Sequence, residues 1–333
     1  MIIYTSGTTG NPKGALHAHR VVLGHLPNVE MCHDFLPKPG DLMWTPADWA
    51  WIGGLINALF AFWYHGVPLV GHRARKFEPQ AAMQMMADLG IRNVFLPPTA
   101  LKLMRQADVK HAGVKLRSIF TGGESLGGEL LGWVRDTFGI DAHEVFGQTE
   151  CNLVIGSNSN LFPIRPGSMG KATPGFDVRI VNDTGEELPR ATRGIIGVRQ
   201  PCPCTMIEYW RNPEATAKKY AGEFLLTGDL GVQDEDGYFW YVSREDDVIT
   251  TAGYRVGPSG DRAHADEASG GGDVGGGRHS RSDPHRIDQG LDRAAAGLCA
   301  ERRAGARDPG FCESAARRAR ISALRAVRGD ACR

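Results

Sequence analysis

Short apolar runs alternate with segments of helical periodicity through the first half of the chain. The runs NVFL (93–96), SIF (118–120) and EVF (144–146) are bounded by polar residues, which is typical of short buried strands. Segments 98–107 and 126–138 have the apolar spacing of amphipathic helices. Strand and helix in alternation predict a βαβαβ unit. The expected fold class is therefore α/β, with a parallel sheet covered by helices.

The pattern changes from about Pro166 onward. Three strand candidates, FDVRIVNDTGEELP, GIIGVRQP and GYFWYVSR, are separated by Asn, Asp and Gly, which is typical of hairpin turns. We expect an antiparallel β subdomain after the parallel sheet. The opening residues MIIYTS predict one more strand.

The segment 49–71, WAWIGGLINALFAFWYHGVPLVG, contains no Lys, Arg, Asp or Glu. It is long enough to raise a transmembrane helix as an alternative. Asn57, His65 and Pro68 favour a buried helix followed by a strand in an α/β core. We therefore expect no integral membrane segment.

Composition and charge argue against some classes of protein function. The 333 residues carry 38 Lys+Arg against 38 Asp+Glu, and this balance does not favour nucleic acid as a partner. Seven cysteines without a regular spacing favour reduced thiols and a cytoplasmic location. Cys202 and Cys204 match no common zinc motif, and no second pair follows them.

Three polar, glycine-bearing segments are candidates for chemistry. YTSGTTGNPKG (4–14) combines hydroxyl side chains and glycines with Lys13, a composition suited to phosphate oxygens, although it is not a Walker A loop. Taken alone, the segment is more typical of a flexible Ser/Gly turn than of a phosphate loop. TGGES (121–125) and GQTE (147–150) follow predicted strands, and ligands bind at the carboxyl ends of parallel strands.

Six motifs occur in a fixed order: YTSGTTGNPKG, TGGES, FGQTE, LLTGDL, YVSREDDVI and AGYRVGPS. Together they resemble the adenylate-forming superfamily of acyl-CoA synthetases, carrier-protein adenylation domains and luciferases. The resemblance spans residues 1–259. WTPADWAWIGG and YWRNPEATAKKY are most similar to the acetyl-CoA and medium-chain acyl-CoA synthetase branch.

The resemblance implies a reaction in which a carboxylic acid and ATP give an acyl adenylate and pyrophosphate, after which CoA displaces AMP. Mg²⁺ would assist, and Thr149 and Glu150 would be catalytic, with Glu150 as the metal ligand. The nucleotide-binding residues implied are Thr5, Ser6, Thr8, Thr9 and Lys13 at the pyrophosphate, Gly122, Gly123 and Glu124 at the adenine, Thr149 at the α-phosphate, and Asp229 with Arg244 at the ribose. Gly7, Gly10 and Gln148 are also implied as nucleotide-binding residues.

The resemblance also assigns residues outside the nucleotide site. Asp246 would be the hinge of the small domain, while Gly253 and Arg255 would contact CoA. Gly147 stands where acetate-specific relatives carry a bulky Trp, which implies an acid longer than acetate, either medium-chain or aromatic. Trp49 and Trp51 would line that acyl pocket, or would be ordinary core residues.

The resemblance divides the chain into a large domain (1–246), a hinge with the start of a small domain (247–259), and a tail (260–333). The tail has 14 Arg and no Lys, and it departs from the Glu-Ile-Glu segment that the family pattern continues with. We expect a one-base frameshift near Ser259 and a disordered tail; the alternative is a genuine divergent tail.

The resemblance further implies a portion before Met1 and a catalytic Lys in the small domain, both missing here. We therefore expect impaired catalysis. Two other readings stay open: an adenylation domain that loads a carrier protein, and a non-catalytic nucleotide-binding fragment.

Overall fold

The computed structural model describes residues 1–5, 12–124, 126–244, 249–251 and 254–256. The chain divides into two units, 1–270 and 271–333, and the second lies outside the described residues. The predicted frameshifted tail, residues 260–333, also lies outside the described residues.

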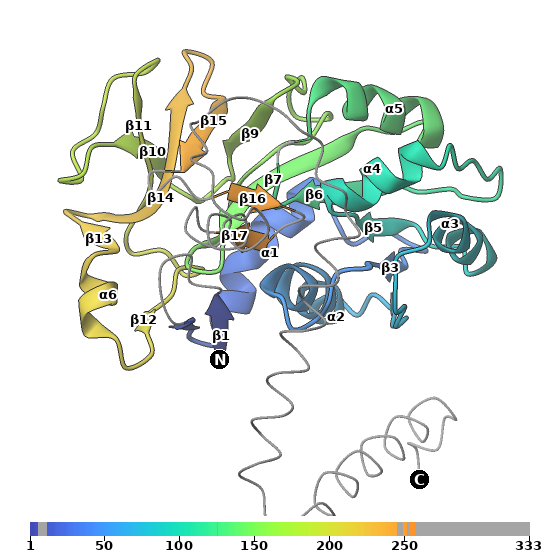
Figure 1. Ribbon diagram of the computed structural model, residues 1–333, viewed down its shortest axis with the longest axis horizontal. Coiled ribbons are helices and arrows are strands. Elements are labelled where there is room, and N and C mark those ends of the chain that lie inside the picture. The colour runs from blue at the N-terminus through green and yellow to red at the C-terminus, as the bar shows by residue number, and fades with distance from the viewer. Residues whose placement is uncertain (6–11, 125, 245–248, 252–253, 257–333) are drawn as a thin grey trace, which may run out of the picture. The chain divides into compact units, whose positions relative to one another are not determined.

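One large sheet of twelve strands organises the described part of the chain (Figure 1). Its order is β10-β11-β14-β15-β9-β8-β7-β6-β5-β3-β4, with β13 paired to β14. The parallel part consists of β3 (Met43–Trp44), β4 (Leu69–Val70), β5 (Asn93–Phe95), β6 (Ser118–Gly122) and β7 (Ala142–Gln148). The antiparallel part consists of β8 (Asn152–Gly156), β9 (Ser168–Ala172), β10 (Val178–Val181), β11 (Arg193–Arg199), β13 (Tyr220–Ala221), β14 (Phe224–Gln233) and β15 (Phe239–Arg244).

Both predicted parts of the sheet are confirmed. Strands β5, β6 and β7 coincide with the three apolar runs. The antiparallel strands expected after Pro166 are β9, β10, β11, β13, β14 and β15. The two parts form one continuous sheet, because β9 pairs with β8 on one side and with β15 on the other.

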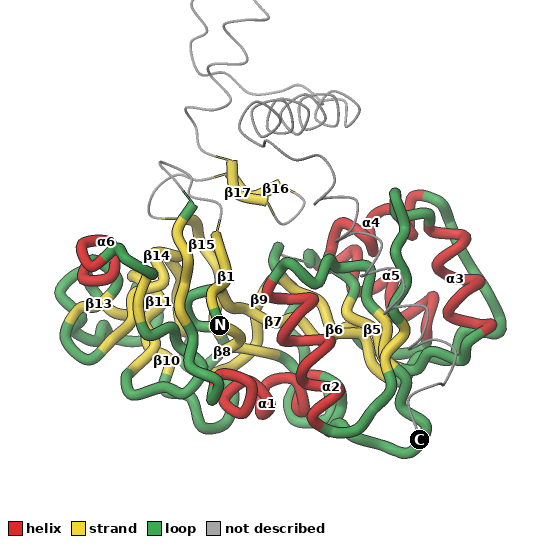
Figure 2. Tube along the Cα trace, turned by 90° about the horizontal axis from the view of Figure 1, so that it is seen from below, coloured by secondary structure: helices red, strands yellow, loops and turns green. Residues whose placement is uncertain are grey.

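Helices cover both faces of the parallel strands (Figure 2). One face packs against α1 (Val21–Cys32), the π-helix η1 (Gly53–Phe60) and α2 (Ala61–Tyr64), and the other against α3 (Pro79–Asp88), α4 (Pro98–Gln106) and α5 (Gly128–Phe138).

Alternation along the strands assigns side chains to the two faces. Phe95 and Phe120 enter the core beneath α1 and α2, whereas Val94 and Ile119 enter the core beneath α3, α4 and α5. Successive residues of a strand point to opposite faces, so strands buried on both sides read as continuous apolar runs. This is why the sequence pattern located them.

The uncharged segment 49–71 folds as a helical segment followed by a strand, as predicted; η1 is mostly buried, whereas Trp63 and Tyr64 at the end of α2 are exposed. It contains η1, α2 and β4. Among the described residues, none of the helices has both the length and the apolar character that crossing a membrane requires.

A second, three-stranded sheet carries the phosphate-loop candidate. It consists of β1 (Ile2–Thr5), β2 (Lys13–Leu16) and β12 (Glu208–Tyr209), the last followed by α6 (Pro213–Ala217). Thr5 stands opposite Lys13 in the antiparallel β1–β2 pair, so this pair closes the two ends of the loop. A separate hairpin is formed by β16 (Ile249–Thr251) and β17 (Tyr254–Val256).

Candidate active site

The turn that joins β7 to β8 carries Thr149 and Glu150. The Cys151 amide donates to the Gln148 carbonyl at 3.3 Å and closes the turn, and the Met206 amide donates to the Glu150 carbonyl at 2.7 Å. β7 runs parallel to β6, with Val145 opposite Gly122. The GQTE and TGGES motifs therefore end at the same edge of the sheet, where parallel sheets bind ligands.

A buried polar network joins this turn to the TGDL motif. Gln148 donates from Nε2 to the Thr227 carbonyl at 3.0 Å and to the Asp229 carboxylate. Arg244 donates from Nη1 to Asp229 Oδ1 at 2.9 Å. Gln148, Asp229 and Arg244 come from β7, β14 and β15, so three sequence-predicted residues lie together.

A second network joins Glu150 to the phosphate-loop hairpin through Tyr209. The Tyr209 hydroxyl donates to Glu150 Oε1 at 2.6 Å, and Lys13 Nζ lies 5.3 Å from the centre of the Tyr209 ring. Glu150 and Tyr209 are each 3% exposed. The aromatic ring faces a cation and its hydroxyl holds a carboxylate, both favourable arrangements. Tyr209 was missed from the sequence, because its pairing with β2 joins residues far apart in the chain.

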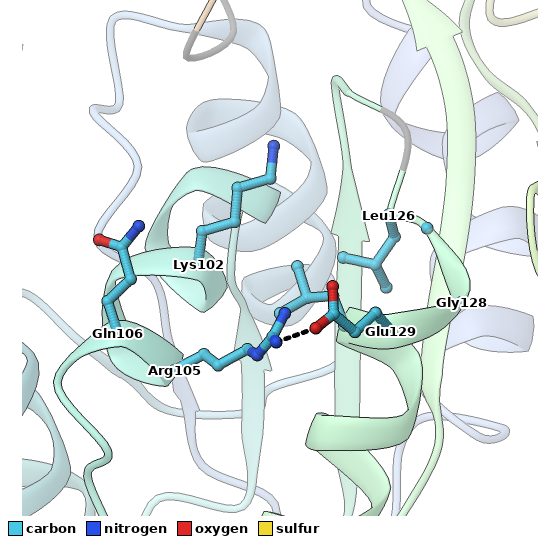
Figure 3. A pocket seen from close by; sticks show the side chains of 8 residues that line it. Lys102, Arg105, Gln106, Leu126, Gly128 and Glu129 are labelled. Carbon is cyan, nitrogen blue, oxygen red and sulfur yellow. Dashed lines mark hydrogen bonds and ion pairs between the residues drawn. The ribbon is translucent and has the colours of Figure 1, made fainter. Parts of the chain in front are cut away.

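Glu124, the predicted adenine-loop residue, is held by α4. Thr99 donates to Glu124 Oε1 at 3.0 Å, and Lys102 Nζ lies 3.3 Å from Glu124 Oε2. An open pocket beside this contact lies between α4 and α5 (Figure 3) and is lined by Lys102, Arg105, Gln106, Leu126, Gly127, Gly128, Glu129 and Leu130. Arg105 pairs with Glu129 there, so both cations of the pocket already face carboxylates.

The two candidate tryptophans lie in different places. Trp51 stacks on Phe95 with ring centres 5.8 Å apart. A Cβ at Gly123, where φ is +97°, would lie 3.6 Å from the Trp51 ring. Trp49 is 40% exposed and lies against Gly71 instead. Of the pair, Trp51 alone is brought to the TGGES loop.

Gly147 occupies a position with no room for a side chain. A Cβ there would lie 1.7 Å from the Asn152 carbonyl oxygen and 2.9 Å from Leu153 Cα. The β7–β8 register also shifts between Phe146 and Gly147. Glycine is required here by the close approach of β8, whatever its effect on the acyl pocket.

Two further charged or titratable residues lie near the turn, and the sequence did not single them out as site residues. His17 is 1% exposed, and burial lowers its pKa to about 4 despite the backbone of Thr149 and the charge of Glu150. Lys219 donates to the Leu226 and Thr227 carbonyls at 3.1 and 3.0 Å, and burial lowers its pKa. A neutral histidine and a lysine thus adjoin the carboxylates of Glu150 and Asp229.

Several predicted site residues lie near or beyond the ends of the described ranges. Those outside the described residues are Ser6, Gly7, Thr8, Thr9, Gly10, Asp246 and Gly253. Arg255 belongs to β17, where it pairs with Thr250.

Residues 1–210 match the family described as AMP-binding enzyme. The match contains three of the six motifs: YTSGTTGNPKG, TGGES and FGQTE. It also contains Thr99 and Lys102, whose side chains contact Glu124. The chain belongs to the AMP-binding enzyme family.

Relatives of this AMP-binding enzyme chain are acyl-CoA synthetases. It is 37% identical over 262 residues to human mitochondrial acyl-coenzyme A synthetase ACSM4, an alignment that covers 77% of this chain and 45% of that protein. It is 34% identical over 265 residues to Bacillus subtilis acetyl-coenzyme A synthetase, covering 78% and 46%. The chain thus spans about half the length of the curated relatives it matches.

Solved structures agree with the fold. ATP-bound MatB from Rhodopseudomonas palustris is similar with a TM-score of 0.63 and 27% identity, covering 80% of this chain and 52% of MatB. The α/β fold of this AMP-binding enzyme chain is therefore that of adenylate-forming enzymes, as the sequence motifs predicted.

Proposed function

We propose that this chain is the core of an AMP-forming acyl-CoA synthetase, an acid–thiol ligase. The observation that supports it best is the joining of four motifs by two buried networks. Gln148 with Asp229 and Arg244 unites three of them, and Glu150 with Tyr209 brings in the hairpin that holds Lys13. These motifs are widely separated in sequence, and their convergence supports the proposal that they bind one nucleotide together.

The charge of each site residue suits it to a different part of the nucleotide. Lys13 and the hydroxyls of the loop would neutralise and hold the β- and γ-phosphates, and Thr149 would donate to the α-phosphate where charge builds up during attack by the carboxylate. The Asp229 carboxylate, already oriented by Arg244 and Gln148, would accept from the ribose hydroxyls. Fixed donors and acceptors of this kind accelerate a reaction because they need no reorganisation in the transition state.

Glu150 fits a magnesium ion that arrives with ATP. The described residues contain no cluster of three or more His, Cys, Asp or Glu that could hold a metal by itself. Mg²⁺ usually binds one or two carboxylates together with substrate phosphates and water. The single buried carboxylate of Glu150 matches that pattern, and the ion would neutralise phosphate charge.

The acid and the acceptor belong to the same proposal. We propose an acid longer than acetate, with Trp51 beside Gly123 as one wall of its pocket, and CoA as the acceptor, since the relatives are acyl-CoA synthetases. Loading of a carrier protein is the alternative acceptor reaction. The cytoplasmic location stays a prediction, as do the roles of Asp246, Gly253 and Arg255.

The tail is proposed to be frameshifted after Ser259, with the small domain and its catalytic Lys lost. Sequencing the gene on both sides of codon 259 tests this directly. We expect a one-base change to restore the family pattern; a coding frame with no such solution would contradict it.

The function is tested by titrating the purified chain with ATP, AMP and a nonhydrolysable acyl adenylate in the presence of Mg²⁺. We expect the adenylate analogue to bind more tightly than ATP or AMP, because it occupies both the nucleotide and acyl sites. Pyrophosphate exchange should be slow. Absence of binding by all three nucleotides would overturn the proposed function, and rapid exchange would overturn the proposed impairment.

A further inference from the structure

Three thiols gather behind the Thr149–Glu150 turn. Cys202 Sγ and Cys204 Sγ are 3.4 Å apart, and Cys204 Sγ donates to the Cys151 carbonyl at 3.0 Å. All three are unoxidised cysteines. None takes part in the proposed reaction, so this cluster needs an explanation of its own.

The Cys-Pro-Cys turn is held in place from several sides. The Thr205 hydroxyl donates to the Cys202 carbonyl at 2.9 Å, and Asn152 Nδ2 donates to the Cys204 carbonyl at 2.5 Å. Gly24 of α1 packs so closely that a Cβ on it would lie 2.9 Å from the Cys204 nitrogen. The two sulfur atoms are therefore kept side by side by the fold itself.

We propose that Cys202 and Cys204 form a dithiol site that a peroxide converts into an intrachain disulfide. The Cys202 thiolate attacks one peroxide oxygen and the O–O bond breaks. With hydrogen peroxide the product is a sulfenic acid, and the leaving hydroxide takes up the proton that the Cys202 thiol released, giving water. The Cys204 sulfur then attacks the Cys202 sulfur, and the hydroxyl leaves as water. In sum, two thiols and one hydrogen peroxide give one disulfide and two waters, with two electrons passing from sulfur to oxygen.

Geometry and chemistry both select Cys202 as the attacking residue. Cys202 is 7% exposed, whereas Cys204 and Cys151 are fully buried. When Cys202 is a thiolate, the Cys204 S–H can turn from the Cys151 carbonyl to the Cys202 sulfur; this hydrogen bond, with those from the backbone of Cys204 and Thr205, lowers the pKa of Cys202 to about 7. The thiolate is the form that reacts with peroxides. A disulfide needs the sulfur atoms to approach to about 2.05 Å, which is a small movement from their present contact.

Oxidation of Cys202 and Cys204 would change the contacts of the neighbouring turn, residues 148–151. A Cys204 sulfur in a disulfide has no hydrogen to donate to the Cys151 carbonyl, and Cys151 directly follows Glu150. The turn 148–151 would then lose one of the contacts that fix it. This inference concerns the chemistry of the thiols and does not depend on the proposed function.

Peptide mapping of the full chain tests the site. The protein is treated with equimolar hydrogen peroxide, remaining thiols are alkylated, and trypsin releases peptide 200–211, which contains Cys202 and Cys204 and no other cysteine. We expect this peptide to be lighter by two hydrogens and unalkylated, and to recover both thiols after dithiothreitol. Cys32 is the internal comparison, because it is fully buried and burial raises its pKa.

Variants and hydrogen exchange separate the alternatives. Cys202→Ser and Cys204→Ser should each abolish the change in peptide 200–211, and Cys151→Ser should leave it. Amide exchange in residues 148–152 should become faster on oxidation. A doubly alkylated peptide 200–211 from folded, peroxide-treated protein, or a bond joining Cys204 to Cys151, would overturn the proposal; the wild-type map decides this even if a variant does not fold.

Discussion

Asp229 and Arg244 stand directly opposite each other on β14 and β15, and their side chains form an ion pair with a 2.9 Å contact. The side chains are 6% and 10% exposed, so the pair is shielded from water and from salt. A buried pair is costly to break, because the remaining charge keeps its desolvation penalty.

Asp229→Asn should therefore lower the free energy of unfolding by about 3 kcal/mol and weaken AMP binding. The substitution keeps the shape of the side chain and removes the charge opposite the guanidinium. Urea denaturation followed by circular dichroism measures the change. Asp183→Asn, at an exposed position, is the matched control and should stay within about 0.5 kcal/mol of wild type. Equal losses in both variants would contradict a special role for the pair.

Tyr209→Phe removes the hydroxyl that donates to Glu150 at 2.6 Å and keeps the ring beside Lys13. A hydrogen bond to a charged group is worth about 1.5–3 kcal/mol, so we expect a stability loss of that size and weaker binding of ATP with Mg²⁺. Calorimetric titration with and without Mg²⁺ measures the second effect. Tyr4→Phe is the control, since Tyr4 is 65% exposed. An unchanged Mg²⁺ dependence would show that Tyr209 does not orient Glu150.

Gly147→Ala should be strongly destabilising, by about 3 kcal/mol or more, because the new Cβ would lie 1.7 Å from the Asn152 carbonyl oxygen. Gly132→Ala is the matched control: it lies within α5, and a Cβ there meets nothing within 4 Å. In a helix, Ala is favoured over Gly by up to about 1 kcal/mol. Thermal unfolding should shift the two variants in opposite directions, and a shared direction would refute the steric reading of Gly147.

Glu144 should make stability fall as pH rises. Burial raises its pKa from 4.5 to about 7, so between these values the folded chain keeps a proton that the unfolded chain has released. Glu144→Gln cannot ionise, and its stability relative to wild type should grow from pH 4.5 to about 7 and then level off. The upper limit of the gain is about 3 kcal/mol.

Urea denaturation across that pH range measures the Glu144 effect. Comparison of variant with wild type cancels the opposite trend from His17 and His25, whose pKa values burial lowers to about 4. Glu235→Gln, at an exposed site, is the matched control substitution. A flat Glu144→Gln difference would mean that the carboxyl is ionised throughout.

The elements that depend on local sequence pattern, the buried strands and the helices between them, were predicted from the sequence. The runs that became β5, β6 and β7 are apolar because both of their faces are buried, and the helices between them follow from periodicity. Polar motifs at strand ends located the Gln148–Glu150 turn correctly at the carboxyl edge of the sheet.

Contacts between distant segments were not predictable in this way. The pairing of β12 with β2, which places Tyr209 beside Lys13, leaves no mark in either segment alone. The same holds for Cys204 and Cys151, whose contact depends on the turn after β11 meeting the start of β8. The collision that reserves position 147 for glycine likewise arises only when β8 folds back.

The pairing of β2 with β12 also sets an order of events during synthesis. The β1–β2 hairpin leaves the ribosome well before its third strand, Glu208–Tyr209, which lies about 190 residues later in the chain. Strands that are far apart in the chain lose loop-closure entropy before their contacts stabilise the pairing, so such pairings form late. Until then the opening strands present an unpaired edge, which is open to the wrong partner. The nascent chain should thus be most vulnerable to misassociation at the strands that flank the proposed phosphate loop.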